Sequence, residues 1–164
     1  MAVTKHLVRL PQAQLERMSV DTSIAEQLLS FQLTPPDDHL DLDWASTGLM
    51  KLVATATAGV CEAFTMVIQG VRTVVHESAM EELYSDIRCV DSADVKRAAQ
   101  VLSVSDATAF GDAIPDDLEA LRQVLQSREL PNDAERYYRK HYNAVVAFVQ
   151  QAAARDLAMV MWWE

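Results

Sequence analysis

Glycine and cysteine are scarce in this 164-residue sequence, and their scarcity excludes several kinds of site. The chain has four glycines, and no segment matches the glycine-rich loops that cradle nucleotide phosphates. The patterns GxSxG and HExxH, typical of serine hydrolases and zinc proteases, are also absent. The two cysteines, Cys61 and Cys89, lack CxxC spacing, so we interpret them as small hydrophobic residues. We therefore expect no cofactor.

Basic residues are also few. The sequence has 14 Lys and Arg against 24 Asp and Glu, which gives a net charge of −10. Such a chain repels phosphate backbones and anionic lipid headgroups, so we expect neither nucleic acid nor membrane as a partner. The first residues do not resemble a signal peptide, and the longest uncharged stretch, 141–154, is too short to span a bilayer. A cytoplasmic protein with one domain, 1–164, is the expectation.

The spacing of apolar residues predicts more helix than strand. Strand patterns occur at 5–10, 71–76, 86–90 and 157–163. Helical patterns occur at 12–18, 24–31, 49–56, 60–70, 95–102, 118–125 and 138–152. The Trp162-Trp163 tail would be costly to leave in water, so we expect it to be a buried strand after a long helix. The predicted fold class is α+β: one helix-rich domain with a small mixed β-sheet covered by helices.

Polar residues before the helical patterns predict where several helices begin. Ser19 or Asp21 is placed to cap the second helix, and Asp43 to cap the helix containing residues 49–56. Asn132, followed by Glu135, predicts a capped start for the longest helix. The segment 35–38, Pro-Pro-Asp-Asp, predicts a break that we interpret as an internal loop.

Three stretches resemble the YfbM-like proteins, a family known as a domain of unknown function. They are Leu40-Asp41-Leu42-Asp43-Trp44 followed by Gly48-Leu49, then Val90 to Val95 with Ala98-Ala99 and Leu102, and finally Tyr138 to Trp163. Together with the opening strand, they cover nearly the whole chain. The resemblance implies helices packed around a mixed sheet in one domain. It implies no activity, because the family has no settled one. A lysine usual after the second aspartate is missing here, where Trp44 follows Asp43 directly.

His39-x-Asp41-x-Asp43 is the most suggestive local arrangement. In an extended segment, residues two apart face the same side, so one imidazole and two carboxylates could bind a divalent cation. The alternative, which we prefer, is that Asp43 caps a helix while His39 and Asp41 face water. The three residues are therefore low-ranking metal candidates.

Two further clusters have a functional and a plain interpretation. His76-Glu77 with Glu81-Glu82 could supply a general base, but such a run is more often a solvated loop. In the second cluster, aromatic residues with interleaved cations could stack on a ligand, but the simpler interpretation is that Tyr138, His141 and Tyr142 form the buried side while the cations face water. This cluster comprises Arg136, Tyr137, Tyr138, Arg139, Lys140, His141 and Tyr142.

Three function hypotheses remain open at this point. The first is a non-catalytic binding protein that neutralises a basic protein partner, as immunity proteins neutralise toxins; it rests on the net charge and on the lack of catalytic motifs. The second is an enzyme or metal-binding protein with a site near His39, Asp41 and Asp43, or at His76. The third is a structural homo-oligomer, and the sequence does not distinguish a monomer from a homodimer.

Overall fold

Five strands form a single antiparallel sheet in the order β2-β1-β5-β4-β3. The computed structural model describes residues 4–30, 34–80, 84–104, 110 and 114–164. The strands are β1 (Lys5–Pro11), β2 (His39–Asp41), β3 (Arg72–Val75), β4 (Ile87–Val90) and β5 (Leu157–Trp163). All four strand pairs are antiparallel. The expectation of a mixed sheet is wrong in this respect, because residue spacing identifies a strand but not the direction of its neighbour.

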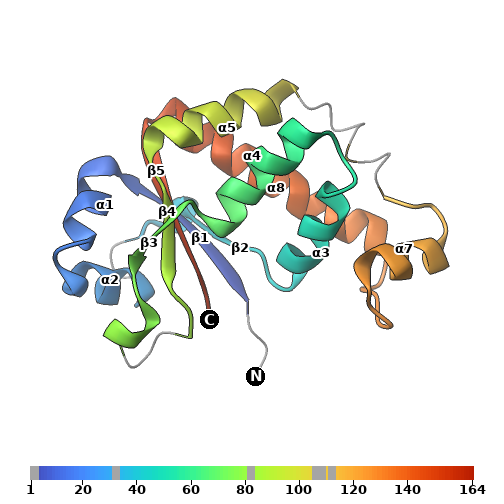
Figure 1. The fold of residues 1–164 in the computed structure, drawn as a ribbon, viewed down its shortest axis with the longest axis horizontal. Helices are drawn as coiled ribbons and strands as arrows, with labels where there is room; N and C mark the ends of the chain where they lie inside the picture. Colours follow the sequence, from blue (N-terminus) through green and yellow to red (C-terminus); the bar gives the residue numbers. More distant parts are fainter. Residues whose placement is uncertain (1–3, 31–33, 81–83, 105–109, 111–113) are drawn as a thin grey trace.

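Helices cover both faces of the sheet (Figure 1). The helices are α1 (Gln12–Met18), α2 (Thr22–Leu29), α3 (Ala45–Val53), α4 (Ala58–Gln69), α5 (Ser92–Val104), α7 (Leu118–Leu125) and α8 (Ala134–Ala154), with short 3-10 helices η1 (Pro36–Asp38) and η2 (Glu77–Ala79). Helices α1 and α2 lie on one side, and α3, α4, α5 and α8 on the other. None of the helices in the described part of the chain combines the length and apolar character needed to cross a bilayer.

The two ends of the described chain pair at the centre of the sheet. Strand β1 pairs with β5 from Lys5 opposite Trp163 to Pro11 opposite Leu157. Thr4 and Glu164 extend the ladder with backbone N–H to O distances of 2.6 and 3.0 Å. Trp162 is 1% exposed. The prediction of a buried C-terminal strand after a long helix is therefore confirmed.

Alternation along the strands divides the core in two. Successive side chains of a strand point to opposite faces. The face covered by α3, α4, α5 and α8 receives Leu7, Val90, Met159 and Met161. The face covered by α1 and α2 receives Val8, Leu10, Ile87, Cys89, Val160 and Trp162. A central strand of this kind is buried on both faces, which explains why β5 is apolar throughout.

The predicted helices are present, but two of their predicted caps are wrong. Asp21 does cap α2, accepting a hydrogen bond from the Ser23 N–H. By contrast, Trp44 occupies the N-cap position of α3 and Asp133 that of α8, where Asp43 and Asn132 were expected. The two aspartates Asp43 and Asp133 adopt left-handed backbone conformations with φ of 50° and 51°. Phe31, predicted to face the core in the second helix, lies outside the described residues.

A buried ion-pair network joins β1, η1 and the end of α8. Arg9 is 3% exposed, and its Nη2 lies 2.9 Å from Asp38 Oδ1. The Nη2 of Arg155 donates to Asp38 Oδ2 at 3.0 Å. Arg9 also donates to Gln151 Oε1 at 2.7 Å, and its guanidinium stacks 4.2 Å from the centre of the Phe148 ring. The network thus gives a counter-charge to a cation that the sheet buries against α8, although the Arg9 Nε has no hydrogen-bond partner among the described residues.

Replacing Asp38 with asparagine should destabilise the fold by about 3–5 kcal/mol, because the Arg9 charge would remain buried without its partner. Hydrogen bonds from Arg155, together with Arg9, hold the pKa of Asp38 below its ordinary value of 3.8. The stabilisation is therefore fully present above about pH 4 and is lost as the pH falls through the lower pKa of the folded state. Urea unfolding of the wild type and of Asp38→Asn across this range measures both effects, because only the wild type should lose stability as Asp38 becomes protonated. The control is Asp37→Asn, which changes the neighbouring exposed carboxylate. If Asp37→Asn lowered the free energy of unfolding as much as Asp38→Asn does, the role of Asp38 as the partner of Arg9 would be contradicted.

Candidate partner-binding site

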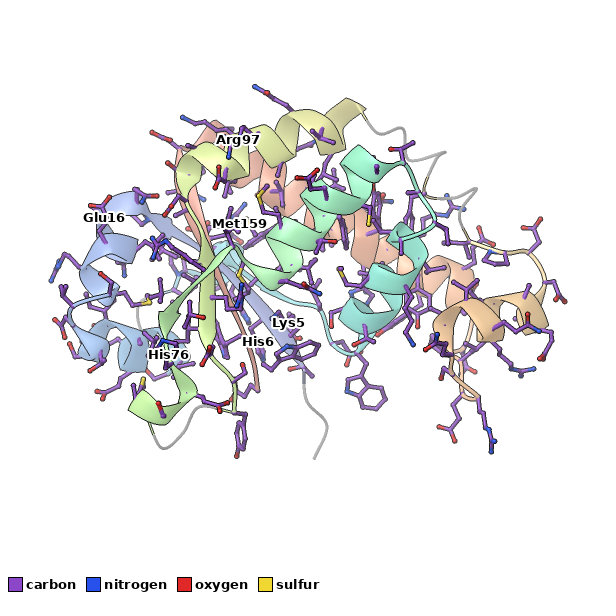
Figure 2. The ribbon with its side chains drawn as sticks, in the orientation of Figure 1. Lys5, His6, Glu16, His76, Arg97 and Met159 are labelled. Carbon is purple, nitrogen blue, oxygen red and sulfur yellow. The ribbon has the colours of Figure 1, made fainter. Side chains whose placement is uncertain are left out.

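In the structure His39 contacts another histidine, His6. His39 Nε2 lies 2.9 Å from His6 Nδ1, and the two rings stack with centroids 5.1 Å apart. The His6 ring stacks in turn on Trp162 at 5.4 Å. Burial, and then the nearby His6, lowers the pKa of His39. His39 is thus part of a histidine pair beside the start of β1, where Figure 2 shows His6 and Lys5.

Nothing in this geometry supports the cation-site interpretation. In the described ranges, no three His, Cys, Asp or Glu side chains are grouped so that they could hold a metal ion. Asp41 instead accepts a hydrogen bond from the backbone N–H of Asp43 at 2.7 Å. This contact forms an Asx turn, a local structure in which an aspartate side chain replaces a backbone acceptor.

The turn places two carboxylates and an indole on the surface before α3. Asp41 and Asp43 are exposed, and the Trp44 side chain is 66% exposed. The left-handed backbone at Asp43 is one that aspartate tolerates better than most residues. Trp44 is the N-cap residue of α3 and its ring is in solvent, and no side chain of the described residues, that of Asp43 included, makes a capping hydrogen bond to this helix.

Residues at the beginning of α8 contact this turn. The Tyr137 hydroxyl donates to Asp43 Oδ2 at 3.2 Å. The Tyr137 ring meets His141 edge-on, with centroids 4.6 Å apart. Burial, together with the Asp43 charge, raises the pKa of Tyr137 to about 12. Burial, and then Lys140, lowers the pKa of His141, so its imidazole is neutral at pH 7. We call Asp41, Asp43, Trp44, Tyr137 and His141 the acidic–aromatic patch.

The other aromatic residues of α8 pack in the core. Tyr138 is 7% exposed and Tyr142 2%. Tyr142 stacks between Phe64 and Phe110, at centroid distances of 5.4 and 3.9 Å. The core-packing interpretation is therefore correct for these two tyrosines, while Tyr137 contributes to the surface. Helical spacing separates the two sides of α8 but does not identify the segment that faces Tyr137.

Helix α3 packs closely on α8 just behind the patch. The position of Gly48 leaves no room for a Cβ atom, because the Tyr138 ring would overlap it. This close approach brings the beginning of α3 against the beginning of α8. It therefore fixes the distance between Trp44 and the aromatic residues of α8.

The remaining candidates lie elsewhere. The His76 side chain is 74% exposed, and its Nδ1 lies 3.5 Å from Asp86. It sits by β3 in Figure 2, while Glu81 and Glu82 fall outside the described residues. Cys89 is buried, which raises the pKa of its thiol to about 11, so the thiol stays protonated at neutral pH. Cys61 is half-buried and also free.

Comparison with known proteins identifies the family. The family model for a domain of unknown function, DUF1877, matches residues 1–162. The chain belongs to the DUF1877 family. The fold also resembles the crystal structure of YfbM, a protein of unknown function from Escherichia coli, with a TM-score of 0.65 and 8% identity over 96% of this chain and 98% of that one. At that identity the likeness concerns the fold alone. No curated protein matches this DUF1877 chain in sequence.

Replacing Asp43 with asparagine should lower the pKa of Tyr137 from about 12 toward 10, because the neighbouring negative charge disfavours the phenolate. The pKa is measured from the pH dependence of the ring carbon resonances in tyrosine-labelled protein. The matched control is Asp116→Asn, an exposed carboxylate outside the patch. An unchanged titration in Asp43→Asn would show that burial alone sets this pKa.

Proposed function

We propose that this protein is a non-catalytic binding protein whose acidic–aromatic patch receives an arginine or lysine side chain of a basic protein partner. The observation that carries the proposal is the position of Trp44: its side chain is 66% exposed, beside two carboxylates that are each held by a hydrogen bond. A large aromatic side chain in water is costly unless a partner covers it.

The chemistry of the patch suits a cation with an extended side chain. A guanidinium placed over an indole gains a cation–π interaction, and adjacent carboxylates add charge-assisted hydrogen bonds. Trp, Tyr and Arg are also the residues that dominate binding energy at interfaces. The patch is held in place before binding, because Asp41 is fixed by the Asx turn and Asp43 by Tyr137. Little side-chain entropy is therefore lost on association.

The net charge of −10 supports the same proposal at longer range. Excess negative charge speeds the encounter with a basic protein, and this effect weakens as salt screens the field. A pair of this kind, one acidic and one basic, is the arrangement that immunity proteins and their toxins use. We extend the proposal to a cytoplasmic complex, as the composition suggested.

Replacing Trp44 with alanine should weaken binding to the partner at least tenfold, because the indole provides the central contact. The partner is captured from cells that contain the protein, identified, purified and measured by calorimetry. The matched control is Leu118→Ala, which removes an apolar side chain that is 59% exposed on α7. The proposal fails if Trp44→Ala binds as tightly as Leu118→Ala does, or if the captured partner is acidic.

The charge contribution needs its own variants. The double variant Asp41→Asn with Asp43→Asn should bind the partner with a lower association rate, and that rate should depend less on salt concentration, because two charges are removed at the contact. Asp116→Asn with Glu129→Gln removes the same net charge at exposed positions outside the patch. Equal association rates for the two double variants would contradict a specific role for Asp41 and Asp43. Light scattering of the free protein distinguishes binding of a separate partner from self-association into a homo-oligomer.

A further inference from the structure

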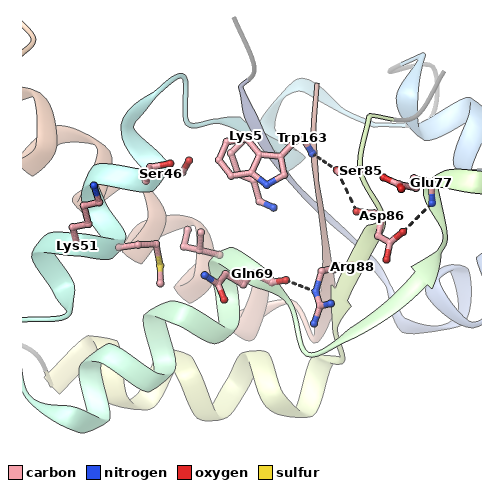
Figure 3. Close-up of a pocket in the computed structure, with 12 residues that line it drawn as sticks. Lys5, Ser46, Lys51, Gln69, Glu77, Ser85, Asp86, Arg88 and Trp163 are labelled. Atoms are coloured by element: carbon pink, nitrogen blue, oxygen red, sulfur yellow. Dashed lines mark hydrogen bonds between the residues drawn. The ribbon is translucent and has the colours of Figure 1, made fainter. Parts of the chain in front are cut away.

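A cavity of about 740 Å³ opens at the end of the sheet, on the face that α3, α4, α5 and α8 cover (Figure 3). Its volume is within the range of small-molecule sites. The walls come from the ends of β1, β4 and β5, from the first turns of α3 and from the last turn of α4. The residues that matter here are Lys5, Ser46, Met50, Ile68, Arg88 and Trp163.

Strand register explains why cations meet in this cavity. Lys5 lies opposite Trp163, and Arg88 lies opposite Met161, so alternation directs Lys5, Trp163 and Arg88 to the same face of the sheet. The Lys5 Nζ atom lies 4.9 Å from the centre of the Trp163 ring. Figure 3 shows these two side chains next to each other among the residues that line the cavity.

The Lys5 side chain is buried in the wall of the cavity without a counter-charge. Lys5 is 4% exposed, and no carboxylate of the described residues forms an ion pair with it. Burial, and then the charge of Arg88, lowers the pKa of Lys5 to about 8. A charged side chain is rarely so buried unless something pairs with it. An anion in the cavity would supply that partner.

Arg88 adds positive charge but has few hydrogen bonds left to offer. Its guanidinium donates to the carbonyl oxygens of Gln69, Gly70 and Val71 at 2.7, 3.2 and 3.3 Å. Lys51, which also lines the cavity, donates to the Leu125 carbonyl oxygen at 2.6 Å. Among the described lining residues, Lys5 is therefore the cation that has neither a hydrogen bond nor an ion pair within the protein. One available ammonium matches an anion of one charge better than a phosphate dianion.

Two carboxylates, those of Asp86 and Glu77, border the cavity. Asp86 accepts hydrogen bonds from Thr73 Oγ1 at 3.1 Å and from the Glu77 backbone N–H at 2.9 Å. Figure 3 shows Asp86 and Glu77 together on the right, with β5 between them and Ser46 in this view. Glu77 is itself exposed. Neither carboxylate neutralises Lys5 by a direct contact.

The first turn of α3 provides hydrogen-bond donors on the opposite wall. Ser46 is 1% exposed, and its buried Oγ has no hydrogen-bond partner among the described residues. No described side chain caps the N-terminus of this nine-residue helix. The first backbone N–H groups of a helix lack partners within it and favour negative charge. A hydroxyl and a helix N-terminus thus line the cavity that Lys5 enters.

We propose that this cavity binds a small organic acid. Its carboxylate would sit between the Lys5 ammonium and the Ser46 hydroxyl, and its apolar body would lie against Met50, Ile68 and Trp163. This ligand site is additional to the acidic–aromatic patch and takes a ligand of opposite charge. The site does not depend on the proposed protein partner.

Calorimetry with phenylacetate and its uncharged analogue phenylacetamide tests the proposal. Phenylacetate should bind at least tenfold more tightly than phenylacetamide, because the amide has no charge to pair with Lys5. At pH 8.5, above the pKa of Lys5 in the free protein, phenylacetate should also cause net proton uptake, since a bound anion raises that pKa. Titrations in two buffers with different ionisation enthalpies measure this uptake.

Variants assign the binding to this cavity. Lys5→Met should reduce phenylacetate affinity at least tenfold and abolish the proton uptake, and Met50→Trp should block the cavity without changing charge. Lys140→Met, an exposed cation on α8, should bind phenylacetate as the wild type does. Equal affinity for acid and amide, unchanged binding by Lys5→Met, preferential binding of inorganic phosphate, or no binding of phenylacetate up to about 10 mM would each overturn the proposal.

Discussion

Strands β1 and β5 pair over their full length at the centre of the sheet, and most other features of the molecule take their position from this pair. The pairing sets which side chains of each strand face α1 and α2 and which face the larger group of helices. It also places Lys5 opposite Trp163 and His6 opposite Trp162, so the cavity and the histidine pair lie back to back at one end of the sheet. A shift of register by one residue would exchange these two environments.

Local sequence patterns were sufficient for most of the elements and for the buried tail. They work where a single period, of two or of 3.6 residues, is sustained over a whole segment. They did not give the direction of strand pairing, which depends on contacts between distant segments. The caps at Asp43 and Asn132 failed for a related reason. Both rules consider only neighbours along the chain, whereas the Asp43 carboxylate accepts a hydrogen bond from Tyr137, 94 positions away.

Sequence patterns identified two residues of the candidate site, Asp41 and Asp43, but not how the site is arranged. Asp41 and Asp43 attracted notice as carboxylates at alternate positions, yet their structural role is a turn that leaves Trp44 exposed. The contribution of Tyr137 depends on the close approach of α3 and α8 at Gly48. From the sequence, Lys5 is only the first residue of a strand. In the structure, the strand register places it beside Trp163 and near Arg88. The acidic–aromatic patch and the cavity that Lys5 and Arg88 line both depend on contacts between residues distant in the sequence.

The central strand pair also has a consequence for biosynthesis. More than 140 residues separate β1 from its partner β5, so the middle of the sheet stays open during synthesis until β5 has emerged from the ribosome. Closing so long a loop costs chain entropy before the contacts are gained, a topology that slows folding. Until then the edge of β1 that pairs with β5 is unpaired, and an unpaired apolar strand edge is a place where other chains can add.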